Sequence, residues 1–119
     1  MVKIMPPKRN PLNLNPLQLK TLTLLQALAG IEGHVIQKAE DGSVTVAGIP
    51  APHGDHFHMG DAVVASRDAT GLANQAAWVA LERKGLLKSM FPMAAVLTPA
   101  GLGYDTGMAD KILHRHGGH

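Results

Sequence analysis

A helix pattern followed at once by a hairpin pattern, in residues 72–98, most constrains what this chain can fold into. From Leu72 to Lys84, small and apolar side chains recur on one side and polar ones on the other, and Gly85 ends the pattern. The segments "LLKSMF" and "AAVLTP" then flank Pro92 and Met93, which predicts strands at about 86–91 and 94–98. A helix joined directly to a two-stranded hairpin indicates an α+β fold.

A second helix is predicted over about residues 16–29. Asn15 is a good N-cap, Pro16 suits the first helical position, and Gln18 stands three residues after the cap, as in a capping box. Gly30 is a natural stop. The leucines of this helix cover an arc wider than the ~100° stripe of a surface helix. The helix is therefore either central to the core or shared with a second subunit.

The segment between these helices changes its pattern. "SVTVAGI" alternates apolar with polar or small side chains after the turn signal "EDGS", which predicts a hairpin of about residues 34–39 and 43–48. "IPAPHGD" is a loop, because two prolines one residue apart do not fit inside a strand ladder. Residues 59–66 fit either a strand or a short helix by periodicity alone.

Length and composition suggest one domain with a modest core. The chain has 119 residues and no cysteine, which excludes disulfides and thiolate metal sites. Residues 1–14 contain three prolines and are expected to form a flexible basic arm, residues 15–108 the folded domain, and residues 109–119 a C-terminal tail. Because no stretch looks like a signal peptide or a membrane span, we expect a cytoplasmic protein without a membrane segment.

Charge is unevenly distributed along the chain. Residues 1–20 carry four basic and no acidic side chains, whereas the remaining 99 carry seven basic against nine acidic. Non-specific affinity for nucleic acid comes from basic side chains that face phosphates, so this distribution weakens the case for a DNA-binding body. The basic arm fits two interpretations, a segment that follows DNA and a solvated terminus.

At "ALERKGLL" and "LTPAG" the chain resembles winged-helix transcriptional regulators of the MarR type and their relatives. In that family the recognition helix ends in a Leu-Glu-x-x-Gly-Leu pattern and the wing returns into Leu-Thr-x-x-Gly. The matching residues are Leu81, Glu82, Gly85, Leu86, Leu97, Thr98 and Gly101. The likeness covers about residues 59–103. It implies a winged helix-turn-helix with a small three-helix core, helices at about 16–29, 59–67 and 72–84, a β-hairpin wing, and an inserted β-like loop that contains histidines.

The resemblance implies a transcriptional regulator that reads duplex DNA with the helix at 72–84. Asn and Gln pair bidentately with adenine, Arg reaches guanine or phosphate, and Thr and Lys contact phosphate. The candidate DNA-binding residues are Arg67, Thr70, Asn74, Gln75, Arg83, Lys84 and Lys88.

The wing tip departs from the family pattern. "KSMFPMAAV" carries one lysine where a phosphate-gripping wing carries several basic side chains. Met90, Phe91 and Met93 make the tip apolar instead, and exposed apolar patches mark protein or ligand contacts. An interaction module that does not bind DNA therefore stays open as an alternative, as does a wing that folds back onto the first helix and buries Phe91.

Six of the seven histidines lie in two clusters, "HGDHFH" and "HRHGGH". Neutral imidazoles bind metals such as Zn and Ni, and His-x-His on an extended chain puts both rings on one side. His53, His56 and His58 are therefore candidate ligands for Zn or Ni in a metal-responsive regulator. Exposed histidines without a metal fit the same pattern.

No enzyme is expected from these residues. Cysteine is absent, no serine lies in a Gly-x-Ser-x-Gly elbow, and the glycine-rich stretches lack the Gly-Lys-Ser/Thr of a phosphate loop. Apart from a metal, no cofactor is predicted. The expected partners are duplex DNA and a second copy of the chain, because regulators of this shape read paired half-sites as two-fold dimers. The broad leucine arc predicts that Leu17, Leu24 or Leu28 lies near the dimer interface.

Overall fold

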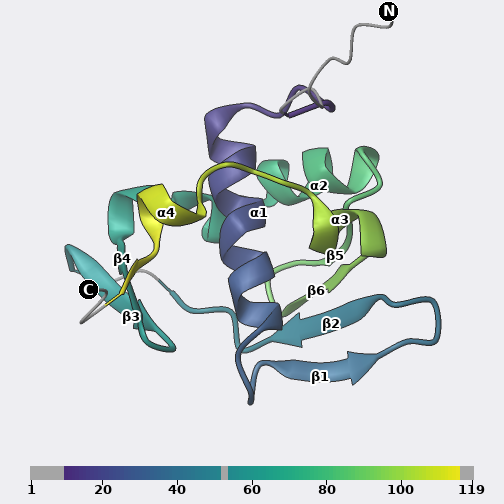
Figure 1. Ribbon diagram of the computed structural model, residues 1–119, viewed down its shortest axis with the longest axis horizontal. Coiled ribbons are helices and arrows are strands. Elements are labelled where there is room, and N and C mark those ends of the chain that lie inside the picture. Colours follow the sequence, from purple (N-terminus) through teal and green to yellow (C-terminus); the bar gives the residue numbers. More distant parts are fainter. Residues whose placement is uncertain (1–9, 52–53, 116–119) are drawn as a thin grey trace, which may run out of the picture.

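The computed structural model describes residues 10–51 and 54–115, which form an α+β fold with two antiparallel sheets (Figure 1). The helices are α1 (Pro16–Ala29), α2 (Gln75–Arg83), α3 (Pro99–Gly103) and α4 (Ala109–Ile112), with two 3-10 helices, η1 (Ser66–Asp68) and η2 (Thr70–Ala73). The strands are β1 (Val35–Lys38), β2 (Val44–Ala47), β3 (His56–Met59), β4 (Ala62–Ala65), β5 (Leu87–Met90), β6 (Ala94–Leu97) and β7 (His114–Arg115).

The two sheets lie on different sides of α1. The larger sheet has the order β1-β2-β6-β5, and the smaller one has the order β3-β4-β7. In Figure 1, α1 stands between the small sheet with α4 and the part that holds α2, α3 and the β5–β6 hairpin. The predicted α1, the early hairpin and the hairpin around Pro92 are confirmed, and α2 is shorter than predicted because η2 occupies its first turn.

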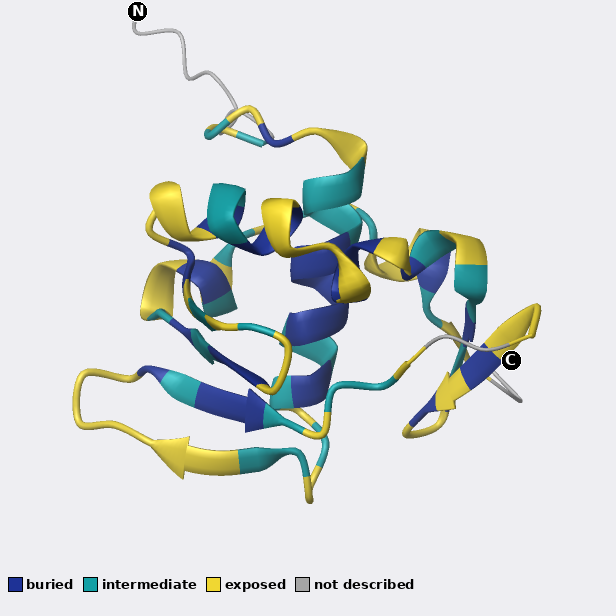
Figure 2. Ribbon diagram, turned by 180° about the vertical axis from the view of Figure 1, so that it is seen from behind, coloured by how far each residue is buried: buried dark blue, intermediate teal, exposed yellow. Residues whose placement is uncertain are grey.

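Helix α1 is the centre of the core. Its N-terminus carries the predicted capping box: Gln18 N donates to Asn15 Oδ1 at 2.8 Å, and Asn15 N donates to Gln18 Oε1 at 3.0 Å. Leu24 and Leu28 are fully buried, as are most of their neighbours (Figure 2). The wide leucine arc is thus used within one chain, so the argument for a dimer interface at these leucines fails. Leu17 is half-buried.

The predicted helix at 59–67 is wrong, and with it the three-helix core. These residues continue β3, turn at Gly60 (φ +60°), and form β4 followed by η1. Burial alternates along both strands, with Phe57 and Met59 of β3 and Val64 of β4 facing the core. The sequence left open whether residues 59–66 form a strand or a short helix. Alternating burial on paired strands shows that this segment belongs to the small sheet.

Both predicted domain boundaries shift outward. Residues 10–14 are folded rather than part of an arm: Leu14 is buried, and the Tyr104 hydroxyl accepts from Leu12 N (3.0 Å) and donates to Asn10 Oδ1 (2.6 Å). Residues 109–115 are not a tail, because Ile112 is buried and β7 pairs with β4. Residues 1–9 and 116–119 lie outside the described residues.

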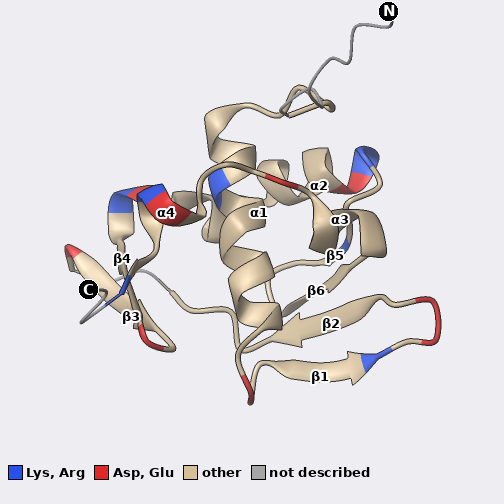
Figure 3. Cartoon of the chain, in the orientation of Figure 1, with Lys and Arg blue, Asp and Glu red and all other residues tan. Residues whose placement is uncertain are grey.

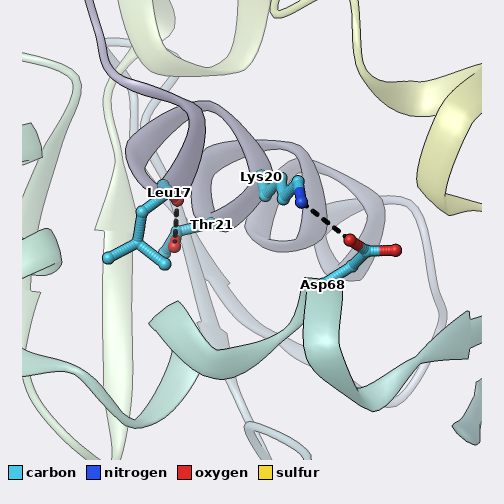
Figure 4. A network of polar contacts seen from close by, with 4 residues as sticks. All are labelled: Leu17, Lys20, Thr21 and Asp68. Atoms are coloured by element: carbon cyan, nitrogen blue, oxygen red, sulfur yellow. Dashed lines mark hydrogen bonds and ion pairs between the residues drawn. The ribbon is translucent and has the colours of Figure 1, made fainter.

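Two glycines permit close packing around the core. Trp78, fully buried, donates from Nε1 to the carbonyl oxygen of Gly71 at 3.0 Å. A Cβ on Gly71 would overlap the Thr21 hydroxyl, which is itself fixed by a 2.7 Å hydrogen bond to Leu17 O (Figure 4). A Cβ on Gly101 would overlap the carbonyl oxygen of Leu86.

Within the described part of the chain, no helix has the length and apolar character needed to cross a bilayer.

Candidate nucleic-acid interface

Helix α2 is built by its cap and its buried face. Asn74 Oδ1 accepts from Ala76 N (3.0 Å) and Ala77 N (3.4 Å), which satisfies two of the free N–H groups at the helix start. Ala77, Trp78 and Leu81 face the core. Bidentate pairing with adenine needs the amide oxygen of an asparagine as acceptor. Because the Asn74 oxygen serves the cap, the prediction that Asn74 reads a base is corrected to a structural role.

The remaining predicted DNA contacts fall into two groups at the ends of α2, with Arg67 apart from both. Thr70 in η2 and Gln75 in the first turn of α2 are exposed at one end, whereas Arg67 is exposed in η1, which follows the small sheet on the other side of α1 (Figure 1). At the other end Arg83, Lys84 and, on β5, Lys88 are exposed. Gln75 and Arg83, the first and last residues of α2, are about 12 Å apart along the helix axis at 1.5 Å per residue.

The face of α2 between these two groups is nearly apolar. Ala76 is exposed, and Val79 and Ala80 are half-buried. Small side chains let a helix approach another molecule closely, but they offer no hydrogen bonds to base edges. Base recognition along this helix would therefore depend on Gln75.

The basic side chains at this surface are free of ion pairs. Among the Lys and Arg residues of 10–51 and 54–115, ion pairs are made by Lys20 with Asp68 (2.8 Å, Figure 4) and by Arg115 with Asp61. The charges of Arg67, Arg83, Lys84 and Lys88 are thus not neutralised within the described chain (Figure 3). Exposed Lys and Arg side chains without an acidic partner are available to contact phosphates.

One acidic side chain lies among these cations. Glu82 Oε1 accepts from Ser89 N at 2.6 Å, which joins α2 to the edge strand β5. The hydrogen bond fixes the angle between helix and hairpin, and it keeps a negative charge next to Arg83 and Lys84. The sequence offered no signal for this contact, because the two residues belong to different elements seven positions apart.

The turn from α2 into the hairpin has the features expected from the family pattern. Leu81 and Leu86 enter the core, and Gly85 adopts φ +78°, a conformation that glycine favours. The Thr98 hydroxyl donates to Gly85 O at 2.7 Å and accepts from Gly101 N at 3.0 Å, which caps α3.

The tip of the hairpin is apolar, and it is partly folded back. Phe91 is half-buried and packs edge-on against Trp78, with ring centroids 5.1 Å apart. Phe91 therefore covers α2. The alternative interpretation placed the folded-back wing on the first helix, α1. Met90 and Met93 remain 53% and 75% exposed. Beside the tip lies a groove of about 440 Å³ lined by loop residues 49–51, by η2 residues and by Phe91 and Pro92.

The structure places two of the three predicted metal ligands together. His56 and His58 are exposed on the same side of β3, and their ring centroids are 6.1 Å apart. His53 lies outside the described residues. Among residues 10–51 and 54–115, no three His, Asp or Glu side chains form a group that could hold a metal ion.

Comparisons with protein-family models, with curated proteins and with solved structures give no match for this chain. The candidate surfaces therefore have to be judged on their own geometry.

Proposed function

We propose that the chain is a winged-helix DNA-binding protein that contacts duplex DNA through α2 and the β5–β6 hairpin, in the role of a transcriptional regulator. The observation that carries this proposal is a group of exposed cations, without ion pairs to described residues, at the C-terminal end of α2 and on the adjoining hairpin. Arg83 and Lys84 stand at the end of α2, with Lys88 on the adjoining strand, while Arg67 lies apart in η1. A surface helix that ends in cations beside a hairpin suits docking at the major groove, because phosphates border that groove.

The contacts divide by chemistry. Arg67, Arg83, Lys84 and Lys88 serve the phosphates, while Gln75, at the start of α2, serves a base edge. Thr70 adds a hydroxyl near the same end. Asn74 contributes indirectly, since its cap sets where α2 begins.

Binding by this surface should be weak and only moderately sensitive to salt. Four basic contacts give a slope of roughly −3.6 in a plot of log affinity against log salt, at about −0.9 per contact on B-DNA. Glu82 lowers the attraction further, because its carboxylate stays beside the cations.

The proposal is tested by titrating the full chain with random-sequence duplex at low salt. The double variant Arg83→Gln/Lys84→Gln should reduce the salt slope by about 1.8, because two phosphate contacts are removed. The matched control is Lys38→Gln/Lys111→Gln, which removes the same charge from exposed, unpaired lysines on β1 and α4. The control should leave the slope unchanged.

Two results would contradict the proposal. No retardation of the duplex at low salt would end the DNA interpretation. Equal loss of affinity in the two double variants would show that the net charge binds DNA and that α2 has no special part.

A second candidate function rests on the exposed methionines of the hairpin tip. Met93 is 75% exposed and Met90 53%, next to the groove at Phe91. Soft, adaptable methionines beside a groove suit contact with another protein. If DNA binding is absent, Met90→Ser/Met93→Ser is the variant with which to test recognition of a candidate protein.

A further inference from the structure

Two methionines flank the turn of the hairpin around Pro92. Met93 is 75% exposed and Met90 is 53% exposed, whereas Met59 of β3 is 3% exposed and Met108 is half-buried. Across the turn, Met93 N donates to Met90 O at 3.0 Å. Both thioether side chains are therefore accessible to small solutes at the same end of the larger sheet.

The two exposed methionines differ in what they cover. Met90 of β5 pairs directly with Ala94 of β6, so the two side chains lie on the same face of the sheet. This face is opposite to that of Ala95, which is fully buried in the core. Ala94 is nevertheless only 5% exposed, and Met90 is placed to cover it. Met93 lies in the turn itself and leaves most of its surface to solvent.

We propose that Met90 and Met93 are a site of reversible oxidation by hydroperoxides, at which sulfoxide formation on Met90 loosens the hairpin tip. Oxidation of methionine to its sulfoxide adds one oxygen atom and is reversed by methionine sulfoxide reductases. The proposal goes beyond contact of the tip with another protein, and it does not depend on DNA binding.

The reaction balances within one thioether and one hydroperoxide, for which H₂O₂ is the simplest case. The sulfur lone pair attacks one peroxide oxygen, so an S–O bond forms as the O–O bond breaks. The departing hydroxide takes the proton of the transferred oxygen, and the products are the sulfoxide and water. Sulfur loses two electrons and the peroxide gains them. The step uses no other group of the protein, so access to the sulfur decides its rate.

The sulfoxide has different consequences at the two positions, because it turns a flexible apolar side chain into a polar one. On Met93 the new oxygen is surrounded by water, since this residue is mostly exposed. On Met90 it lies beside Ala94, where a polar group without a hydrogen-bond partner costs free energy. The oxidised Met90 side chain therefore withdraws toward water and uncovers Ala94.

Movement at Met90 is transmitted to the next residue along the chain. Phe91 packs edge-on against Trp78, with ring centroids 5.1 Å apart. Trp78 is the one tryptophan of the chain, so its fluorescence reports this contact. Met93 is thus expected to oxidise first with little effect on the Trp78 signal. Met90 should oxidise more slowly and change that signal clearly.

The test treats the full chain with H₂O₂ at neutral pH and follows each methionine by peptide mass mapping, together with Trp78 fluorescence. Met93 and Met90 should oxidise at least about tenfold faster than Met59, which becomes accessible only when the fold opens. The fluorescence change should follow the oxidation of Met90. Methionine sulfoxide reductases A and B with dithiothreitol should restore both the mass and the fluorescence.

Met90→Leu and Met93→Leu are a matched pair of variants, since each keeps an apolar side chain and removes one sulfur. Met90→Leu should abolish the fluorescence change, while Met93→Leu should keep it. Circular dichroism before oxidation confirms that each variant is folded. The proposal is overturned if Met59 oxidises as fast as Met90 and Met93, if Met90→Leu responds as the natural chain does, or if reductase treatment leaves the altered fluorescence in place.

Discussion

The two sheets of this protein differ in what holds them. The larger sheet presents Val46, Ala95 and Leu97 to the core, where they are fully buried, and its edge strand β5 is tied to α2 by Glu82. The smaller sheet ends in a strand of two residues and turns its histidines outward. Both sheets give side chains to the core, but the smaller one also has a face whose histidine side chains are exposed. The larger sheet is therefore held by contacts on more sides than the smaller one.

The largest expected effect is in the half that contains the larger sheet. Trp78→Ala removes a fully buried ring, its hydrogen bond to Gly71 O and its contact with Phe91. We expect the free energy of unfolding to fall by about 3–5 kcal/mol, the range for loss of a large aromatic side chain. Urea denaturation followed by circular dichroism measures it. Trp78→Phe keeps most of the side-chain volume, so its free energy of unfolding should fall clearly less. An equal fall in the two variants would argue against packing as the cause.

An intermediate loss of stability is expected from a substitution where the small sheet meets the core. Ile112, buried just before β7, is the apolar anchor of α4. Ile112→Ala should cost about 2–3 kcal/mol, at the lower end for such truncations because this end of the chain can relax. Amide hydrogen exchange should speed up most in β4 and β7 and clearly less in the paired strands β2 and β6. Uniform acceleration throughout the chain would mean that the two sheets open as one unit.

The smallest effect is expected at the turn of the β1–β2 hairpin. Asp41 accepts from Ser43 N (2.8 Å) and from Ser43 Oγ (3.0 Å), and these hydrogen bonds lower the pKa of its carboxyl below the ordinary value. A lowered folded-state pKa gives stability that is present above the unfolded pKa, about 3.9, and is lost as the pH falls through the folded value.

The substitution Asp41→Asn isolates this charge. At neutral pH the variant should melt slightly below the natural chain, by an amount near the limit of detection because Asp41 is exposed. The difference should disappear as the pH is lowered below about 4. Ser43→Ala is the companion variant. If the difference in melting temperature between the natural chain and Asp41→Asn grows toward acid pH, the stabilising charge does not belong to Asp41.

Local signals predicted much of the fold. The cap at Asn15, the stop at Gly30 and the turn before "SVTVAGI" act over a few residues, so their elements were found nearly where they occur. The hairpin around Pro92 was found for the same reason.

The failures come from contacts between distant residues. Residues 59–66 form a strand partly because β7, some fifty positions later, pairs with β4, and no short window contains that information. The same pairing puts His114 in one row with His58, with Val63 of β4 between them, which the spacing of the "HGDHFH" cluster could not indicate. Asn74 was misassigned because its residue type suits both a helix cap and a base contact. The candidate DNA-binding cations Arg67, Arg83, Lys84 and Lys88 are exposed, and their contact with DNA remains a prediction.

The close contacts at Gly71 and Gly101 have a consequence for how this protein can change over generations. Exposed positions on β1, α2 or the tip can exchange one side chain for another with little cost to the fold. At Gly71 a single added carbon meets Thr21, and at Gly101 it meets the backbone at Leu86, which cannot be substituted away. A descendant may lose every charge discussed above and still keep the fold, but it has to inherit these two glycines. They are the positions by which a highly diverged relative should be recognised.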